Sequence, residues 1–292
     1  MKIVLNKPSN WLIILAMLSA TAPIIAQKPA IDWAFIPTGT FTMGSPRNEV
    51  GRTKDETQHQ VTLSAFKMSK QEVTVKQFKT FVDATGYKTD AEKGTGGRKG
   101  SSVWKYGEEM FTKKWLLVGQ DDANWRYDIY GKIRPESDYN HPVIHVSWND
   151  VKAFADWMGC RLPTEAEWEY ACRAGTSTPY HTGNKLTLAQ AVISKKYPTN
   201  ERKTEPVGSY PPNNWGLYDM HGNAMEWCSD WYGDYPVGAQ TNPKGPANGQ
   251  FRIFRGGSCI AWEEHCRSAY RCRNVPDLRN AEVGFRLVQD TK

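Results

Sequence analysis

The side chains with the widest chemical range in this sequence are six cysteines, all in the second half of the chain: Cys160, Cys172, Cys228, Cys259, Cys266 and Cys272. Thiols can act as nucleophiles, bind soft metal ions or pair as disulfides. No CxxC pair occurs, so neither a zinc ribbon nor a thioredoxin-type motif is indicated. An even cysteine count favours disulfides if the protein is exported, although the sequence leaves the pairing open.

Histidine and serine chemistry is less well supported. Among the six histidines only His141 and His145 show HxxxH spacing and no HExxH motif occurs, so a three-histidine metal site is not indicated. Ser258, His265 and Asp219 could be drawn as a hydrolase triad, but no strained nucleophile turn surrounds Ser258. We therefore expect His145 and His221 to be polar core or turn residues.

The N-terminus predicts export. A basic start is followed by an apolar stretch over 11–25 and then by Ala26. This order is typical of a signal peptide, which we place at residues 1–26. The stretch is too short, and too interrupted by residues such as Pro23, for a transmembrane helix. We expect a secreted or periplasmic protein with no membrane span once the signal is removed.

The remaining chain, residues 27–292, has the length of one domain. Its lysines and arginines are scattered, and the formal net charge of the whole chain is only +6, so a nucleic-acid partner is not indicated. We expect a monomer. The 24 glycines and 17 prolines indicate many turns and few long helices.

Three helices and several short strands should position the candidate side chains. Apolar residues recur at helical spacing after a capping residue in segments 74–85, 147–159 and 164–172. Residues 35–44 are predicted to form a hairpin, and 59–66 alternate like a strand. The basic, glycine-rich segment 94–102 is expected to be a loop, and residues from 204 onward should form short strands and turns. The fold class is therefore α+β, with high coil content.

Six stretches, in the same order, make the chain similar to the formylglycine-generating enzyme, or sulfatase-modifying factor, family. Together they span residues 33–288, nearly all of the chain after the signal. The resemblance implies a single compact domain with little regular secondary structure, related to C-type lectin domains. The stretches are 35–44 (FIPTGTFTMG), 141–148 (HPVIHVSW), 161–170 (RLPTEAEWEY), 216–227 (GLYDMHGNAMEW), 255–258 (RGGS) and 284–286 (GFR).

The resemblance also implies an activity. Active members of the family use oxygen, and copper(I) held by two cysteines, to convert a cysteine of a sulfatase into formylglycine. Their target is an extended Cys-x-Pro-x-Arg peptide. The partner implied for this chain is therefore a sulfatase polypeptide or another extended peptide.

The family further implies bound calcium. Asp219 and Glu226, by side chain, and Gly222 and Ala224, by backbone carbonyl, match the family's calcium loop. Calcium prefers several hard oxygen ligands, which such a turn can supply. The alternative is a structural turn in which Asp219 acts as a cap and Glu226 pairs with an arginine. The family's second calcium loop corresponds to 191–194, which lacks the expected asparagine, so we predict one calcium ion.

The family's catalytic residues are only partly matched. Counting from Ser258, which matches, the first copper-binding cysteine corresponds to Ala261 and the second to Cys266. Counting back from the GFR stretch requires a one-residue insertion. A rearranged copper site would use Cys266 with Cys259 or with the thioether of Met225, and the candidate catalytic residues are Cys266, Cys259 and Ser258.

Two further family positions differ: Met225 stands where active members have a tryptophan, and Glu282 where they have an asparagine. The family's disulfide pattern implies a bridge from Cys172 to Cys266 or Cys272.

Three functions are compatible with these residues. The first is an exported formylglycine-generating oxidase that matures sulfatases. The second is a non-catalytic envelope protein that binds a peptide or a glycan on the same fold. The third is a structural component of the envelope. Trp125, Trp231 and Tyr232 lie outside the predicted helices and are candidates for a binding groove.

Overall fold

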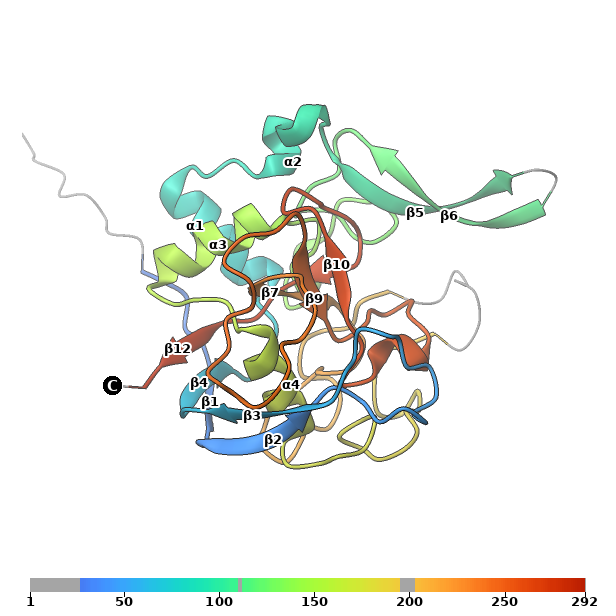
Figure 1. Ribbon diagram of the computed structural model, residues 1–292. Helices are drawn as coiled ribbons and strands as arrows, with labels where there is room; N and C mark the ends of the chain where they lie inside the picture. The colour runs from blue at the N-terminus through green and yellow to red at the C-terminus, as the bar shows by residue number, and fades with distance from the viewer. Residues whose placement is uncertain (1–26, 110–111, 195–202, 292) are drawn as a thin grey trace, which may run out of the picture.

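The computed structural model describes residues 27–109, 112–194 and 203–291 (Figure 1). The predicted signal peptide, 1–26, lies outside these residues. Within the described ranges, none of the helices combines the length and apolar character needed to cross a membrane. Short strands and long coil segments surround a few helices, as the glycine and proline content indicated.

Each of the three predicted helices begins at its predicted capping residue. They are α1 (Val75–Thr85), α3 (Trp148–Met158) and α4 (Glu165–Arg173), each with a capping box. In α4, for example, the Thr164 side chain accepts from the Glu167 amide, and Glu167 accepts from the Thr164 amide. A further single turn, α2 (Asp90–Lys93), follows α1. Short 3-10 helices occupy Thr95–Gly97, Glu136–Asp138 and Glu263–Cys266.

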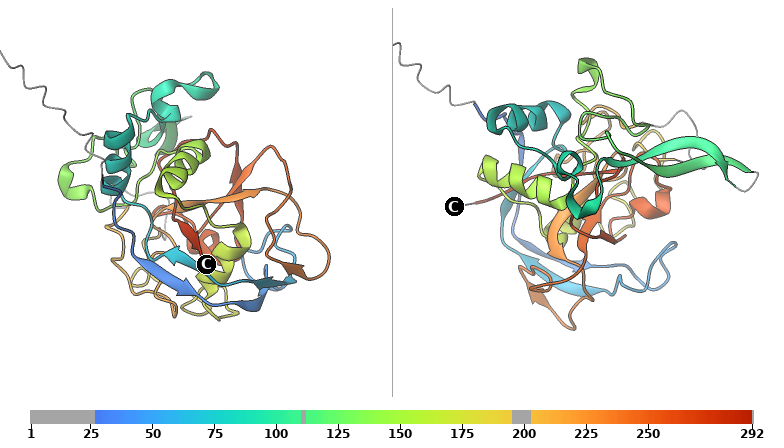
Figure 2. Two further views of the ribbon diagram at one scale, coloured as in Figure 1. Left: turned by 90° about the vertical axis from the view of Figure 1, so that its left-hand side faces the viewer. Right: turned by 90° about the horizontal axis from the view of Figure 1, so that it is seen from above.

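The strands form four small sheets, described by their spatial order. The first is β1 (Trp33–Ile36), β4 (Phe66–Ser69) and β12 (Val288–Asp290); the second is β2 (Gly39–Met43), β3 (His59–Leu63) and β8 (Gln240–Thr241). The third is β10 (Cys272–Asn274), β9 (Arg252–Arg255), β7 (Met225–Trp231) and β11 (Val283–Gly284). The fourth is a two-stranded arm, β5 (Ser101–Glu109) and β6 (Thr112–Gln120), which extends away from the body of the protein (Figures 1 and 2).

The predicted hairpin over 35–44 is wrong in its pairing, although both strands exist. β1 pairs with β4, and β2 pairs with β3, so the two strands lie in different sheets. The predicted strand 59–66 is likewise interrupted after Leu63. The chain passes from one sheet to the other between β1 and β2, and it returns between β3 and β4. The Thr38 hydroxyl links these two connections by donating to the Leu63 carbonyl at 2.8 Å. Turn residues predict a change of direction, but they do not identify the strand's partner.

Two large apolar clusters make up most of the core. One packs α4 against the first two sheets around Trp168, and the other packs α1 and α3 around Phe78, Phe154 and Trp227. Trp125 belongs to this second cluster, only 1% exposed, and its ring lies 5.6 Å from that of Phe78. Its predicted place in a binding groove is therefore wrong.

Candidate functional site

The segment that carries Ser258, Cys259 and Cys266 is held against α4 by buried arginines. Arg255, which precedes this segment, donates to Glu165 at 2.5 Å and to Glu169 at 2.6 Å. Arg271, which follows it, donates to both Glu165 oxygens at 2.7 and 2.9 Å. All four side chains are buried. Because both ends of the segment are bound to one helix, its turns have little freedom to move.

The RGGS turn places Ser258 through two glycines with left-handed backbone conformations. Gly256 has a φ of 98° and Gly257 a φ of 73°. A Cβ on Gly257 would lie 2.3 Å from the Cys266 sulfur, so only glycine fits. The Ser258 hydroxyl then donates to Glu282 Oε2 at 2.7 Å. Ser258 and Glu282, 24 residues apart, therefore meet as the family positions suggest.

A cavity of about 280 Å³ opens beside this pair, and we call it the Cys272 cavity. It brings together Met225, Ala261 and Glu282, three positions that the sequence had singled out. Cys272 is the thiol on its wall, whereas the predicted copper pair, Cys259 and Cys266, does not line it. The lining residues are Trp104, Met225, Ile260, Ala261, Trp262, His265, Tyr270, Cys272 and Glu282.

The sequence had placed Cys272 only in a disulfide. Alternation in an extended chain could have identified Cys272 as a cavity residue. Neighbouring side chains face opposite sides, so Cys272 faces away from the side on which Arg271 meets Glu165.

The thiols near this cavity are not activated. Cys259 and Cys266 are fully buried, and burial raises the pKa of each well above the ordinary thiol value. Burial also raises the pKa of Cys272, to about 11. All three are therefore protonated thiols at neutral pH and weak nucleophiles. The buried Glu282 carboxyl has a raised pKa for the same reason.

The predicted disulfide from Cys172 to Cys266 or Cys272 is not formed, and all six cysteines are free thiols. The Cys172 sulfur instead lies 3.5 Å from the Ser268 hydroxyl and 3.7 Å from the Met220 carbonyl. The chain between the two expected partners thus presents a serine, rather than a cysteine, to Cys172. Counting residues along this irregular segment could not show which of its side chains faces Cys172.

The residues present do not fit the two-thiolate copper site that the family implies. Ala261 stands in the cavity with a methyl group that cannot ligate a metal ion. The sulfur atoms on the cavity wall belong to Cys272 and to the thioether of Met225. In the described ranges, no group of three or more His, Cys, Asp or Glu side chains is arranged to hold a metal ion.

The predicted calcium loop folds into a buried carboxylate cluster. Glu226 accepts from Arg286 at 2.6 and 2.7 Å and from the Trp168 indole at 2.7 Å, so the arginine pairing considered from the sequence is present. Asp219, with a φ of 57°, accepts from the Gly208 amide at 2.6 Å. Gly222 is required here, because a Cβ would lie 2.2 Å from the Val192 carbonyl oxygen.

Glu72, from the segment before α1, completes this cluster, and sequence reasoning missed it. It is fully buried; its Oε2 accepts from the Asn223 side-chain amide at 3.2 Å, and among the described residues its Oε1 has no hydrogen-bond partner. Burial, together with Asp219 and Glu226, raises the pKa of Glu72 well above its usual range. Burial likewise raises the pKa of Asp219, to about 6. No local pattern distinguishes Glu72, so only the tertiary fold reveals its role.

Comparisons with known proteins agree with this architecture. Residues 21–291 match the family model described as Sulfatase-modifying factor enzyme 1-like domain. The chain is 38% identical to the formylglycine-generating enzyme of Bos taurus over 90% of this chain and 76% of the relative. It is 38% identical to that of Streptomyces coelicolor over 87% of this chain and 88% of the relative.

More distant similarities extend the picture. The chain is 31% identical to the "Inactive C-alpha-formylglycine-generating enzyme 2" of Mus musculus, over 89% of this chain and 86% of the relative. Among solved structures, PvdO from Pseudomonas aeruginosa superposes with a TM-score of 0.66 at 28% identity, over 89% of this chain and 94% of that one. The family model, the relatives and the shared α+β fold together establish that the chain belongs to the sulfatase-modifying factor, or formylglycine-generating enzyme, family.

Proposed function

We propose that this protein is an exported, peptide-binding member of the family. It holds an extended segment of a sulfatase or similar polypeptide over the Cys272 cavity, and it does not oxidise the bound cysteine. The observation that carries this proposal is Ala261, which lines the cavity and which the family resemblance, counted from Ser258, matches to a copper-binding cysteine. The name of the mouse relative indicates that the family also contains an inactive protein.

The cavity suits an apolar or thiol side chain of a peptide. Its walls are mainly aromatic and aliphatic, and its rim includes Trp262, which is 44% exposed. The hydrogen bond between Ser258 and Glu282 occupies polar groups that would otherwise oppose an apolar guest. Binding would then rest on burial of apolar surface around one inserted side chain.

The second candidate function is the family's own reaction, the oxidation of a sulfatase cysteine to formylglycine. The observation that favours it is that two residues with soft sulfur atoms, Cys272 and Met225, both line the cavity. Thiol and thioether are both ligands that copper(I) accepts. The oxidase would then depend on Cys272, rather than on the pair Cys259 and Cys266.

One experiment separates the two functions. Copper-loaded protein is incubated under oxygen with a fluorescent Cys-x-Pro-x-Arg peptide, with anisotropy reporting binding and mass spectrometry reporting aldehyde. We expect binding without aldehyde, and Trp262→Ala should weaken binding about tenfold because an aromatic anchor is lost. Val237→Ala, at a fully exposed position away from the cavity, is the control. Aldehyde formation that disappears in Cys272→Ser would establish the oxidase instead, and absence of binding would refute both functions.

We also propose that the carboxylate cluster binds one calcium ion. The cluster contains three buried carboxyl groups, those of Glu72, Asp219 and Glu226, near one arginine, Arg286. It therefore holds more carboxyl groups than a single guanidinium can neutralise. The unpartnered Glu72 oxygen is the second supporting observation. The ligands would be Glu72 and Asp219, with the carbonyls of Gly222 and Ala224. Glu226 would act by holding Arg286, rather than by ligating calcium.

Calcium binding predicts a stability response. At one hundred times the dissociation constant, calcium should add about 2.7 kcal/mol to the free energy of unfolding, so chelation should lower the melting temperature. Asp219→Asn keeps an acceptor for Gly208 and tolerates the positive φ, but it removes a charge. We therefore expect it to abolish the response to calcium. Asp122→Asn, at an exposed carboxylate, should retain it. A melting temperature that is insensitive to both calcium and chelator would contradict the assignment.

A further inference from the structure

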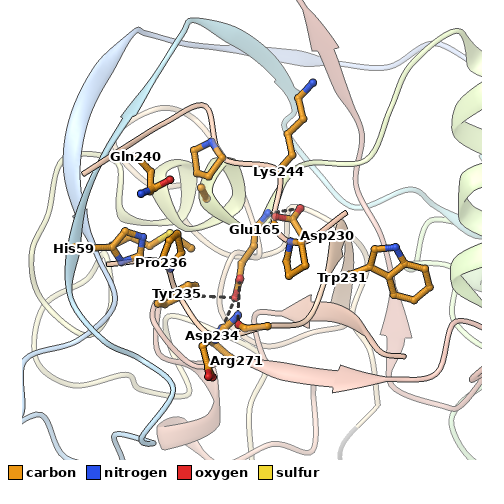
Figure 3. A pocket seen from close by; sticks show the side chains of 16 residues that line it. His59, Glu165, Asp230, Trp231, Asp234, Tyr235, Pro236, Gln240, Lys244 and Arg271 are labelled. Atoms are coloured by element: carbon orange, nitrogen blue, oxygen red, sulfur yellow. Dashed lines mark hydrogen bonds and ion pairs between the residues drawn. The ribbon is translucent and has the colours of Figure 1, made fainter. Parts of the chain in front are cut away.

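A second cavity, of about 330 Å³, lies at the start of α4 and is covered by the segment from Asp230 to Pro246 (Figure 3). We call it the Asp230 cavity. Arg271 lines it, whereas the next residue, Cys272, lines the cavity described above. The two cavities are therefore separate, and the Asp230 cavity plays no part in the function proposed for the other.

Asp230 is the distinctive group in this cavity. The side chain is 4% exposed, and its Oδ2 accepts from the Glu165 amide at 3.0 Å and from the Ser229 hydroxyl at 2.9 Å. In the described part of the chain, its Oδ1 makes no hydrogen bond and Asp230 forms no ion pair. This oxygen is not among the solvent-excluded atoms that lack a partner, so it is accessible from the cavity, where a nearly buried carboxylate would stabilise a donor from another molecule.

The charged side chains around Asp230 are paired or stacked with residues other than Asp230. Glu165 is paired with Arg271 and Arg255. Arg252, the other nearby cation, is stacked between two tryptophan rings at 3.5 and 3.8 Å, and it donates to the Ser229 carbonyl. With no cation in contact, burial and then the charge of Glu165 raise the pKa of Asp230 to about 7.

The rest of the cavity is apolar or uncharged near Asp230. Met43, Ala166 and three prolines contribute aliphatic wall, and Tyr235 contributes a ring whose hydroxyl lies 3.2 Å from Glu165. In Figure 3, His59, Pro236 and Gln240 lie on one side of Asp230 and Trp231 on the other. The remaining charged groups, Asp234 and Lys244, are exposed residues of the covering segment.

This combination selects a ligand with an apolar stem and a cationic head. A purely aliphatic side chain would leave the Asp230 oxygen without a donor, and an anion would be repelled by it. We propose that the Asp230 cavity binds a lysine or arginine side chain of a partner polypeptide, with the ammonium or guanidinium group against Asp230. The stem would pack on the proline and methionine wall, as such side chains commonly do.

The test uses the full chain and three small probes: Nα-acetyl-arginine amide, Nα-acetyl-lysine amide and the neutral citrulline analogue. Ligand-observed NMR should show millimolar binding of at least one cationic probe, and the comparison between them identifies the preferred head group. Citrulline should bind about tenfold more weakly, because it has the shape of arginine without the charge. Affinity should rise between pH 6 and 8, because the ligand prefers the ionised Asp230 carboxylate.

Matched variants separate Asp230 from its neighbours. Asp230→Asn should weaken cation binding about tenfold and remove the pH dependence, whereas Asp234→Asn and His59→Gln should retain both. The folded Asp230→Asn protein should be at least as stable as the parent at pH 8, because a raised carboxyl pKa costs stability as pH rises through it. Equal binding of citrulline, unchanged binding in Asp230→Asn, or tighter binding of a neutral disaccharide than of both cationic probes would overturn the proposal.

Discussion

Replacing Arg286 with methionine is expected to lower the free energy of unfolding by about 3–5 kcal/mol, because it leaves buried carboxylates without their cation. Arg286 is fully buried and donates to both oxygens of Glu226. It also donates to the Tyr218 and Ser69 carbonyls, so the variant leaves several buried acceptors unpaired.

Two control variants make this result specific. Arg286→Lys keeps a charge but cannot form two parallel bonds with Glu226, so it should lose less than Arg286→Met. Arg273→Met removes an arginine that is about half exposed and lies 3.9 Å from Asp55, so it should change stability by less than about 1 kcal/mol. Urea unfolding in the presence of chelator measures all three. A loss below about 1 kcal/mol for Arg286→Met would show that the cluster does not need its arginine.

Replacing Gly257 with alanine should be the second most damaging change, costing about 2–5 kcal/mol. One part is the left-handed backbone, which costs a residue with a Cβ roughly 1–2 kcal/mol. The other part is steric, because the new Cβ would lie 2.3 Å from the Cys266 sulfur and 3.1 Å from its Cα. Relieving such a contact typically costs about 1–3 kcal/mol.

Gly216→Ala isolates the two parts of this cost. Gly216 has a φ of 76°, close to that of Gly257, but a Cβ there would meet nothing within 4 Å. It should therefore lose only the backbone part, about 1–2 kcal/mol. Thermal and urea unfolding of the two variants provide the comparison. If Gly257→Ala were no less stable than Gly216→Ala, the RGGS turn would not be packed against Cys266 as described.

Gly257→Ala also links stability to the proposed function. The alanine must displace the backbone of Cys266, and with it the turn that places Ser258 against Glu282. Peptide binding at the Cys272 cavity should therefore weaken in this variant even under conditions where the protein remains folded. Gly216→Ala should bind as the parent protein does.

Much of the local structure could be predicted from the sequence. The three main helices begin at the predicted capping residues Thr74, Ser147 and Thr164. A capping box involves residues only three positions apart, so neighbouring side chains determine it. The family was also identifiable from short motifs in their order, and the pairing of Glu226 with an arginine was recognised as one of two alternatives.

The tertiary structure alone decided which residues meet over long distances in the chain. β1 and β2 are separated by a short turn, yet they pair with strands from 59–69, because this arrangement buries both sheets against α4. Glu72 joins Asp219 across 147 positions, and Cys272, rather than Cys266, reaches the cavity. Strand pairing, register and burial depend on the whole packed core, so residue spacing could name the candidate side chains but could not show which of them would face each other.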